Sequence, residues 1–226
     1  MTETKIKAVL FDMDGVLIEA KDWHYEALNC ALGLFGHKIR RSEHLETYDG
    51  LPTRKKLEML SRERELPEGL HAFINEIKQQ YTLDYAWNQC KPTFNHEYAL
   101  SRLKSEGYKT ACCSNSIRAS IEMMLDKAAL LRWLDVLVSN QDVAHPKPHP
   151  EMYTKAHTAL GLAADQCLVV EDNQHGIEAA QAAGCHLLVV GTVHEVTYQN
   201  IRSRIEHIEG SRNEHPHPVG GDDGLR

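Results

Sequence analysis

Two aspartates two residues apart, Asp12 and Asp14, follow a short apolar run and are the residues of this chain best suited to chemistry. Carboxylates this close repel each other unless a cation or a shared proton stabilises them. A hard cation with oxygen ligands, above all Mg²⁺, would relieve that repulsion. An EF-hand calcium loop is excluded, because its fifth, sixth and twelfth positions counted from Asp12 would be Val16, Leu17 and Trp23. The pair therefore predicts a magnesium site, with an acid-capped turn as the structural alternative.

Three more polar groups follow apolar runs later in the chain. Ser114-Asn115 offers a hydroxyl and backbone N–H groups that could bond a phosphoryl oxygen. Lys147 lies in a His-Pro-Lys-Pro-His-Pro segment, whose prolines would stiffen the loop that holds the ammonium. Glu171-Asp172 adds hard oxygen ligands. Each signal is weak alone, since a serine before a helix is usually a cap and a single lysine is usually solvated, but together they predict one site.

Five apolar runs predict the strands that position these groups, namely 6–11, 108–113, 135–139, 167–170 and 186–190. Because they lack polar alternation, they are typical of parallel strands buried on both faces. Helical patterns that end at Gly161 and Gly184 separate the later runs. The alternation predicts an α/β fold with a doubly wound, parallel, five-stranded (Rossmann-like) sheet. Ligands of such sheets bind beyond the carboxyl ends of the strands, where the polar groups would meet.

The stretch from residue 17 to about residue 91 contains no convincing strand. Apolar residues recur in it at helical spacing, which predicts helices with one face in a core. Pro92 disfavours helix at the residue before it and marks the return to the sheet. We therefore predict an α/β core domain of residues 1–17 and 92–209 and an inserted all-helical cap domain of residues 18–91. Residues 210–226, rich in Pro and Gly, are predicted to form a flexible tail.

The chain carries 25 Lys and Arg against 32 Asp and Glu, a formal charge of −7. This balance argues against nucleic acid as the main partner, because phosphate backbones are held by clustered cations. No apolar stretch approaches the roughly 18 to 20 residues that span a bilayer, and the first residues lack the features of a signal peptide. The six cysteines have no Cys-x-x-Cys spacing and are typical of free thiols. We expect a cytoplasmic protein without nucleic-acid or membrane partners, as a monomer or weak homodimer.

Four segments together resemble the four motifs of the haloacid dehalogenase superfamily. They are Asp12-Met13-Asp14-Gly15-Val16, Ser114-Asn115, Lys147-Pro148 and Glu171-Asp172-Asn173. The long interval between the first and second segments is similar to that of the branch with a helical cap inserted after the first motif. That branch includes sugar-phosphate phosphatases and β-phosphoglucomutase.

This resemblance implies a site for phosphoryl transfer. Asp12 would be the nucleophile that forms an aspartyl-phosphate. Asp14 would protonate the leaving oxygen and then activate water, a role for which we expect a raised pKa. Mg²⁺ would be held by Asp12, by the main-chain carbonyl of Asp14 and by Asp172, with Glu171 bound directly or through water. Lys147 would add fixed positive charge near the nucleophile.

The resemblance also implies which residues meet the substrate. The catalytic set is Asp12, Asp14, Ser114 and Lys147, and the metal set is Asp12, Asp14, Glu171 and Asp172. The substrate-binding set is Gly15, Ser114, Asn115, Lys147, His24 and Arg54. His24 matches a histidine of β-phosphoglucomutase, with an exposed helical residue as the alternative. Arg54 is a candidate for contact with a second anionic or hydroxylated group, whereas Lys55 and Lys56 are expected on a solvated face.

The sequence thus predicts a Mg²⁺-dependent phosphatase for a small phosphorylated metabolite, a sugar or polyol phosphate. A phosphomutase like β-phosphoglucomutase is the alternative, because it would use the same core residues. A non-catalytic metabolite-binding protein of the same fold is a third reading. Schiff-base chemistry, as in phosphonoacetaldehyde hydrolases, is disfavoured because nothing in the sequence marks the lysines of the predicted cap as desolvated. The lysines considered for this role are Lys21, Lys38 and Lys78.

Overall fold

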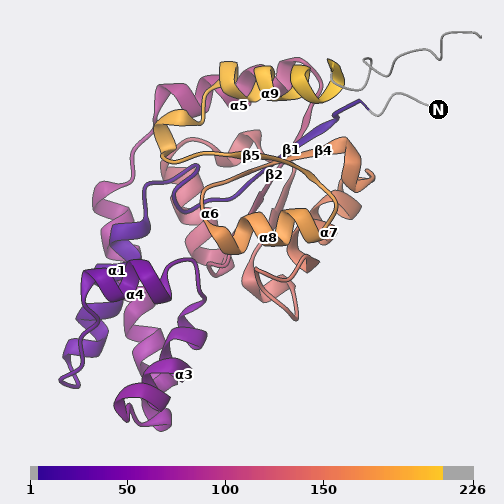
Figure 1. The fold of residues 1–226 in the computed structure, drawn as a ribbon. Coiled ribbons are helices and arrows are strands. Elements are labelled where there is room, and N and C mark those ends of the chain that lie inside the picture. Colours follow the sequence, from indigo (N-terminus) through magenta and orange to yellow (C-terminus); the bar gives the residue numbers. More distant parts are fainter. Residues whose placement is uncertain (1–4, 211–226) are drawn as a thin grey trace, which may run out of the picture.

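The computed structural model describes residues 5–210, and a five-stranded parallel sheet forms its centre (Figure 1). The strands are β1 (Ala8–Phe11), β2 (Lys109–Cys113), β3 (Val136–Val138), β4 (Cys167–Glu171) and β5 (His186–Val189). Their order in the sheet is β3-β2-β1-β4-β5, which places β1 at the centre. The predicted α/β fold class is confirmed. The predicted tail, apart from Gly210, lies outside the described residues.

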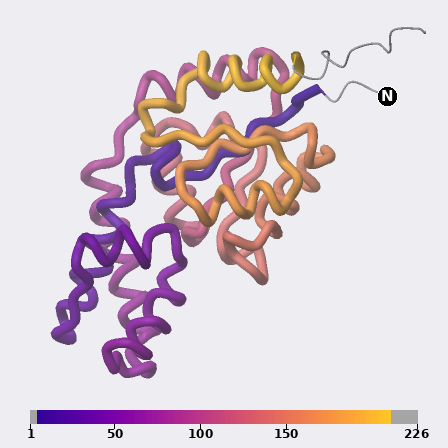
Figure 2. Tube along the Cα trace, viewed as in Figure 1, coloured from indigo at the N-terminus to yellow at the C-terminus, as the bar shows by residue number. Residues whose placement is uncertain are grey.

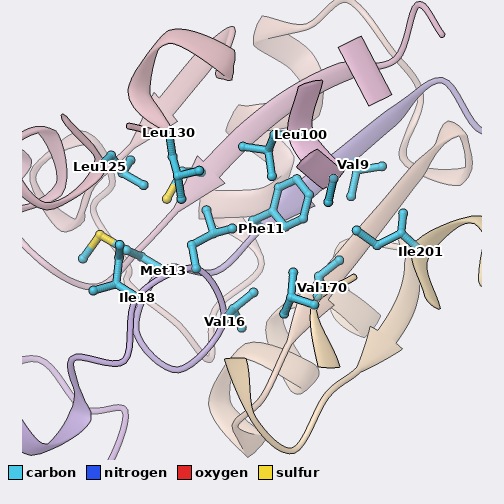
Figure 3. Close-up of a cluster of buried hydrophobic side chains, with 14 of the residues drawn as sticks. Val9, Phe11, Met13, Val16, Ile18, Leu100, Leu125, Leu130, Val170 and Ile201 are labelled. Carbon is cyan, nitrogen blue, oxygen red and sulfur yellow. The ribbon is translucent and has the colours of Figure 1, made fainter. Parts of the chain in front are cut away.

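Helices cover both faces of the sheet because its residues are apolar on both faces. Val9 and Phe11 of β1 pack in one cluster with Leu100 and Ile201, which belong to the helices above that face (Figure 3). The two other residues of β1 pack in a second cluster on the opposite face. The helices of this part of the chain are α5 (Phe94–Ser105), α6 (Arg118–Lys127), α7 (Glu151–Ala159), α8 (Gln174–Ala182) and α9 (Tyr198–Gly210). Helices α5 and α9 lie on one side of the sheet, and α7 and α8 lie on the other (Figure 1).

The chain between β1 and α5 is mostly helical, and its helices gather at one end of the sheet (Figure 2). They are α1 (Lys21–Gly33), α2 (Arg41–Glu43), α3 (Thr53–Arg64) and α4 (His71–Gln89), with a π-helical turn at His44–Tyr48. Leu28, Leu32, Leu57, Leu60 and Ile74 belong to a third apolar cluster that is separate from the two clusters of the sheet. These helices therefore have a core of their own.

Candidate functional site

The carboxyl ends of β1, β2 and β4 bring the candidate residues to one level of the sheet. Phe11 pairs with Cys112 on one side and with Val170 on the other, so the residues that follow leave the sheet together. A cavity lies beyond this edge, and α1, α3 and α4 contribute its other walls. Its lining includes Asp12, Asp14, Lys21, His24, His44, Arg54, Lys56, Lys78, Asn115, Ser116 and Lys147. Gly15, Ser114, Glu171 and Asp172 do not line it.

Lys147 is the centre of the buried part of the site, with only 3% of its surface exposed. Its Nζ donates to Asp12 Oδ1 at 2.7 Å, to Glu171 Oε1 at 2.6 Å and to the carbonyl oxygen of Cys113 at 2.8 Å. Burial would lower the pKa of Lys147, but the two carboxylates outweigh it and the pKa is raised. Burial and the charge of Glu171 hold the pKa of Asp12 well above its usual range, against the opposing effect of the ammonium. Lys147 is thus a fixed positive charge at the end of β1.

The carboxylate of Glu171 is fixed by close contacts on several sides. It ends β4 and is fully buried, and the hydroxyl of Tyr153 donates to the same oxygen that accepts from Lys147. Gly176, in the first turn of α8, lies so close that a Cβ there would come within 1.8 Å of Glu171 Oε1. The carboxylate therefore reaches Lys147 only because residue 176 has no side chain.

Asp14 lies in a second hydrogen-bonded chain on the cavity side. Lys78 Nζ donates to His24 Nδ1 at 3.1 Å, which leaves Nε2 to carry the proton and donate to Asp14 Oδ1 at 3.0 Å. The hydroxyls of Ser116 and Ser114 donate to Asp14 Oδ2 at 3.1 and 3.4 Å. Burial and the nearby Lys78 lower the pKa of His24, so the ring is neutral near pH 7.

Two sequence-based predictions are wrong at this point. Burial by itself raises the pKa of Asp14, but the charge that His24 gains at acidic pH, where Asp14 titrates, and the hydrogen bonds from His24 and Ser116 outweigh it. The pKa of Asp14 is therefore lowered rather than raised. Lys78 is strongly desolvated, because burial among α1 and α4 residues lowers its pKa to about 7. The expected solvated lysine is instead a buried part of the cavity.

The acids at the strand ends fit a hard divalent cation. Carboxylate oxygens of Asp12, Glu171 and Asp172 lie within 4.8 Å of one another. Asp172 is paired with Lys21, whose Nζ lies 2.5 Å from Oδ2, while its Oδ1 is buried without a hydrogen bond. A Cβ at Gly15 would come within 2.0 Å of Oδ2, so the chain passes close to this carboxylate. Carboxylate oxygens are the ligands that Mg²⁺ prefers, so these three acids fit such an ion.

Asn115 links the sheet to the helical segment. Its Nδ2 donates to Gly50 O at 3.1 Å, and its Oδ1 accepts the backbone N–H of Lys147 at 3.1 Å. Ser114 is fully buried behind it and accepts the backbone N–H of Ser116 at 3.0 Å. Asn115 therefore holds the lysine loop and touches the opposite wall of the cavity, while Ser114 orients its neighbours.

On α3, the residue that lies inside the cavity is Lys56 rather than the expected Arg54. The Arg54 side chain is 86% exposed and forms an ion pair with Glu58 at 3.4 Å, although it borders the cavity. Lys55 is exposed as expected, with its Nζ 3.4 Å from the same glutamate. Lys56 is only 7% exposed and lines the cavity, so its assignment to a solvated face is wrong. The helix presents position 56, together with Leu60 one turn later, to the interior.

Several groups at the site were not found from the sequence. Ser116 had a signal, because it stands one residue beyond Ser114-Asn115 in the same loop. Tyr153 was assigned only to an apolar stripe, where its hydroxyl carries no pattern. His44 had no signal, because it lies in a short π-helical turn.

The protein has a parallel sheet with an all-helical segment after its first strand. Buried acids at the strand ends are hydrogen-bonded to a lysine. These features together define a class of α/β enzyme. The amino-acid sequence matches the haloacid dehalogenase-like hydrolase family over residues 9–190. The chain belongs to this family and is a hydrolase of it, as the four motifs indicated.

Relatives and solved structures cover most of the chain. The sequence is 29% identical over 189 residues to "Pyrophosphatase PpaX" of Bacillus cereus, covering 80% of this chain and 81% of that one. It is 27% identical over 191 residues to "Phosphorylated carbohydrates phosphatase" of Thermotoga maritima, covering 84% and 87%. The structure of β-phosphoglucomutase from Clostridium difficile is similar with a TM-score of 0.77 and 22% identity, covering 89% and 98%. That likeness establishes the fold.

Within residues 5–210, no helix combines the length and the apolar character that a membrane crossing requires.

Proposed function

We propose that this protein is a Mg²⁺-dependent phosphatase that hydrolyses a small phosphorylated metabolite, a sugar or polyol phosphate, through an aspartyl-phosphate on Asp12. The observation that carries this proposal is the contact of Lys147 Nζ with Asp12 and Glu171. It fixes a positive charge beside a carboxylate that faces a cavity. A fixed cation lets one anion approach another, which is the main difficulty of phosphoryl transfer. The names of the relatives, both phosphatases of phosphorylated compounds, agree with it.

In the first step Asp12 attacks phosphorus, the bond from phosphorus to the ester oxygen breaks, and a mixed anhydride forms on the aspartate. Asp14 gives its proton to the departing oxygen. The pKa of Asp14 is low in the free protein, and we propose that the negative phosphoryl group raises it on arrival. In the second step Asp14 takes a proton from water, which attacks the anhydride and releases phosphate.

Other residues bind and orient. Mg²⁺ bound by Asp12, the Asp14 carbonyl and Asp172, with Glu171 direct or through water, would offset charge on the phosphoryl oxygens. Asn115, which lines the cavity, would orient the phosphoryl group. Ser114 is buried behind the cavity wall and would position Asp14 through its hydroxyl, and His24 would hold Asp14 in place through its Nε2–H. We assign Arg54 only a contact at the mouth of the cavity, because its side chain is exposed.

We also propose that the helical segment is a cap domain of residues 18–91 on a core of residues 1–17 and 92–209. Its separate apolar cluster supports this division. Closure of the cap would exclude water from the phosphoryl group and select the substrate.

Phosphate release tests the proposal. The purified protein with Mg²⁺ should release phosphate from members of a panel of sugar, polyol and other phosphate esters, and Asp12→Asn should not. Conversion of a sugar 1-phosphate to the 6-phosphate without phosphate release would instead favour a mutase. No turnover of any ester, including an aryl phosphate, would refute both.

A further inference from the structure

The wall of the cavity formed by α3, α4 and the π-helical turn carries Lys56, Lys78 and His44. We propose that these three side chains form a second anion subsite, which binds a carboxylate or phosphate group at the other end of the substrate. The inference rests on the proposed function for the position of the reacting phosphoryl group. It makes the substrate a phosphate ester whose leaving group carries a negative charge of its own.

Neither lysine of this subsite has an anionic partner. Lys56 and Lys78 are 7% and 6% exposed, and within residues 5–210 neither ammonium lies within 4.0 Å of a carboxylate. The Nζ of Lys78 contacts the neutral ring of His24, at 3.1 Å from Nδ1. Buried ammonium groups are normally paired, because burial removes their hydration. Two buried ammonium groups without a carboxylate partner on the wall of one cavity therefore favour the binding of an anion there.

The charges around the two lysines support the same conclusion. Burial lowers the pKa of Lys56 to about 8, and burial together with the charge of Lys56 lowers the pKa of Lys78 to about 7. Asp49 and Asp14 act on Lys56 only at longer range. A hydroxyl group could not offset this repulsion, whereas a bound anion would stabilise both protonated lysines.

His44 supplies an independent observation. It is 2% exposed and lines the same cavity, and its Nδ1 has no hydrogen-bond partner among residues 5–210. A buried polar atom without a partner costs free energy unless a ligand or water satisfies it. Burial lowers the pKa of His44 to about 4, so the ring is neutral. Its Nε2 lies 3.8 Å from Asp49 Oδ1, beyond hydrogen-bond distance, which leaves Nδ1 to donate one hydrogen bond to an anion oxygen.

The other cations at the cavity are already engaged. Lys21 is paired with Asp172 at 2.5 Å, and Lys147 with the acids of β1 and β4. Arg54 is exposed and paired with Glu58. The subsite on α3 therefore belongs to Lys56 rather than to the arginine two residues before it.

Three phosphate esters with the same three-carbon chain test the subsite: 3-hydroxypropyl phosphate, 3-phosphooxypropanoate and propane-1,3-diyl bisphosphate. With Mg²⁺ near neutral pH, kcat/KM should be about tenfold or more higher for an ester with a charged end than for the uncharged one. In Lys56→Gln this ratio should fall about tenfold, mainly through a higher KM for the charged esters. Lys55→Gln removes the same charge one residue away, outside the cavity, and should keep the ratio.

Equal kcat/KM for all three esters in the natural protein, or an unchanged ratio in Lys56→Gln, would overturn the subsite and leave the phosphatase standing. Calorimetric binding of the bisphosphate without added Mg²⁺ needs no turnover. Binding that Lys56→Gln weakens and Lys55→Gln does not, without turnover of any ester, would refute the phosphatase and support the subsite. Absence of both binding and turnover would refute both proposals. Circular dichroism and thermal unfolding verify that each variant is folded.

Discussion

Lys147 neutralises two buried carboxylates at once. Its removal should therefore destabilise the fold by the free energy of leaving buried carboxylates without a cation. In Lys147→Met, Asp12 and Glu171 lose a partner that lies within 2.7 Å of both. Breaking a buried ion pair from one side typically destabilises a protein by about 3 to 5 kcal/mol. We expect a loss of that size in the free energy of unfolding by urea. Adding Glu171→Gln to the variant should recover part of it, and a loss below about 1 kcal/mol would contradict this account of the cluster.

The buried Lys56 predicts a distinct dependence of stability on pH. Its folded pKa of about 8 lies below the ordinary 10.5. Between these values the unfolded chain binds more protons, so stability rises with pH in this window, and below about pH 8 the group gives no slope. The free energy of unfolding of the natural protein should therefore rise relative to Lys56→Gln by up to about 1.4 kcal/mol per pH unit. Parallel urea titrations at several pH values measure it, and identical slopes for the two proteins would contradict the burial of an unpaired ammonium.

The burial of Lys56 and Lys78 is not predicted from the sequence. Lysine is solvated by default, so Lys56 is expected on the surface from sequence, and Lys78 is not expected to be desolvated. A signal existed for Lys78, since Ile74, Lys78 and Thr82 are spaced by four residues and all are buried on α4. The pKa of Asp14 had no such signal, because it depends on a hydrogen bond from another helix.

At the scale of elements, the close approach of α8 to β4 is the feature most sensitive to a single atom. Gly176→Ala places a Cβ within 1.8 Å of Glu171 Oε1, so the carboxylate must move away from Lys147. We expect a loss of about 2 kcal/mol or more of stability and at least a tenfold loss of phosphatase activity. Gly33→Ala, at the end of α1 with open space around it, is the matched control and should be neutral or slightly stabilising. Equal effects of the two substitutions would show that the contact is unimportant.

All five strands could be predicted, because each is a short apolar run and the chain between them has helical periodicity. Phe11, Cys112 and Val170 are paired as the parallel arrangement requires, which brings the motif residues to one edge. The helical segment could be predicted as helical, but not the face that each helix turns to the cavity. The π-helical turn that places His44 gives no pattern, since its hydrogen bonds are set by tertiary packing.

At the scale of the whole molecule, the concentration of acids at one edge predicts that a divalent cation stabilises the fold. Mg²⁺ that binds only the folded chain should raise the midpoint of thermal unfolding as its concentration increases, and chelation should reverse the shift. Asp172→Asn should abolish most of the shift, because this carboxylate is one of the three whose oxygens lie within 4.8 Å of one another. Asp165→Asn, a substitution on the 3₁₀ turn before β4, is the control and should respond like the natural protein. If Mg²⁺ still raised the unfolding midpoint of Asp172→Asn, the ion would bind at another place.

The cavity joins a sheet edge with buried acids to a helical wall with buried lysines, and the central claim is that a phosphoryl group is transferred to Asp12 between them. The most direct test is to quench turnover in acid and to identify the phosphorylated peptide by mass spectrometry. The account predicts one phosphoryl group on the peptide that contains Asp12, and none in Asp12→Asn, which should be folded and inactive. Phosphate release by Asp12→Asn at the natural rate, or a phosphoryl group on another residue, would contradict it.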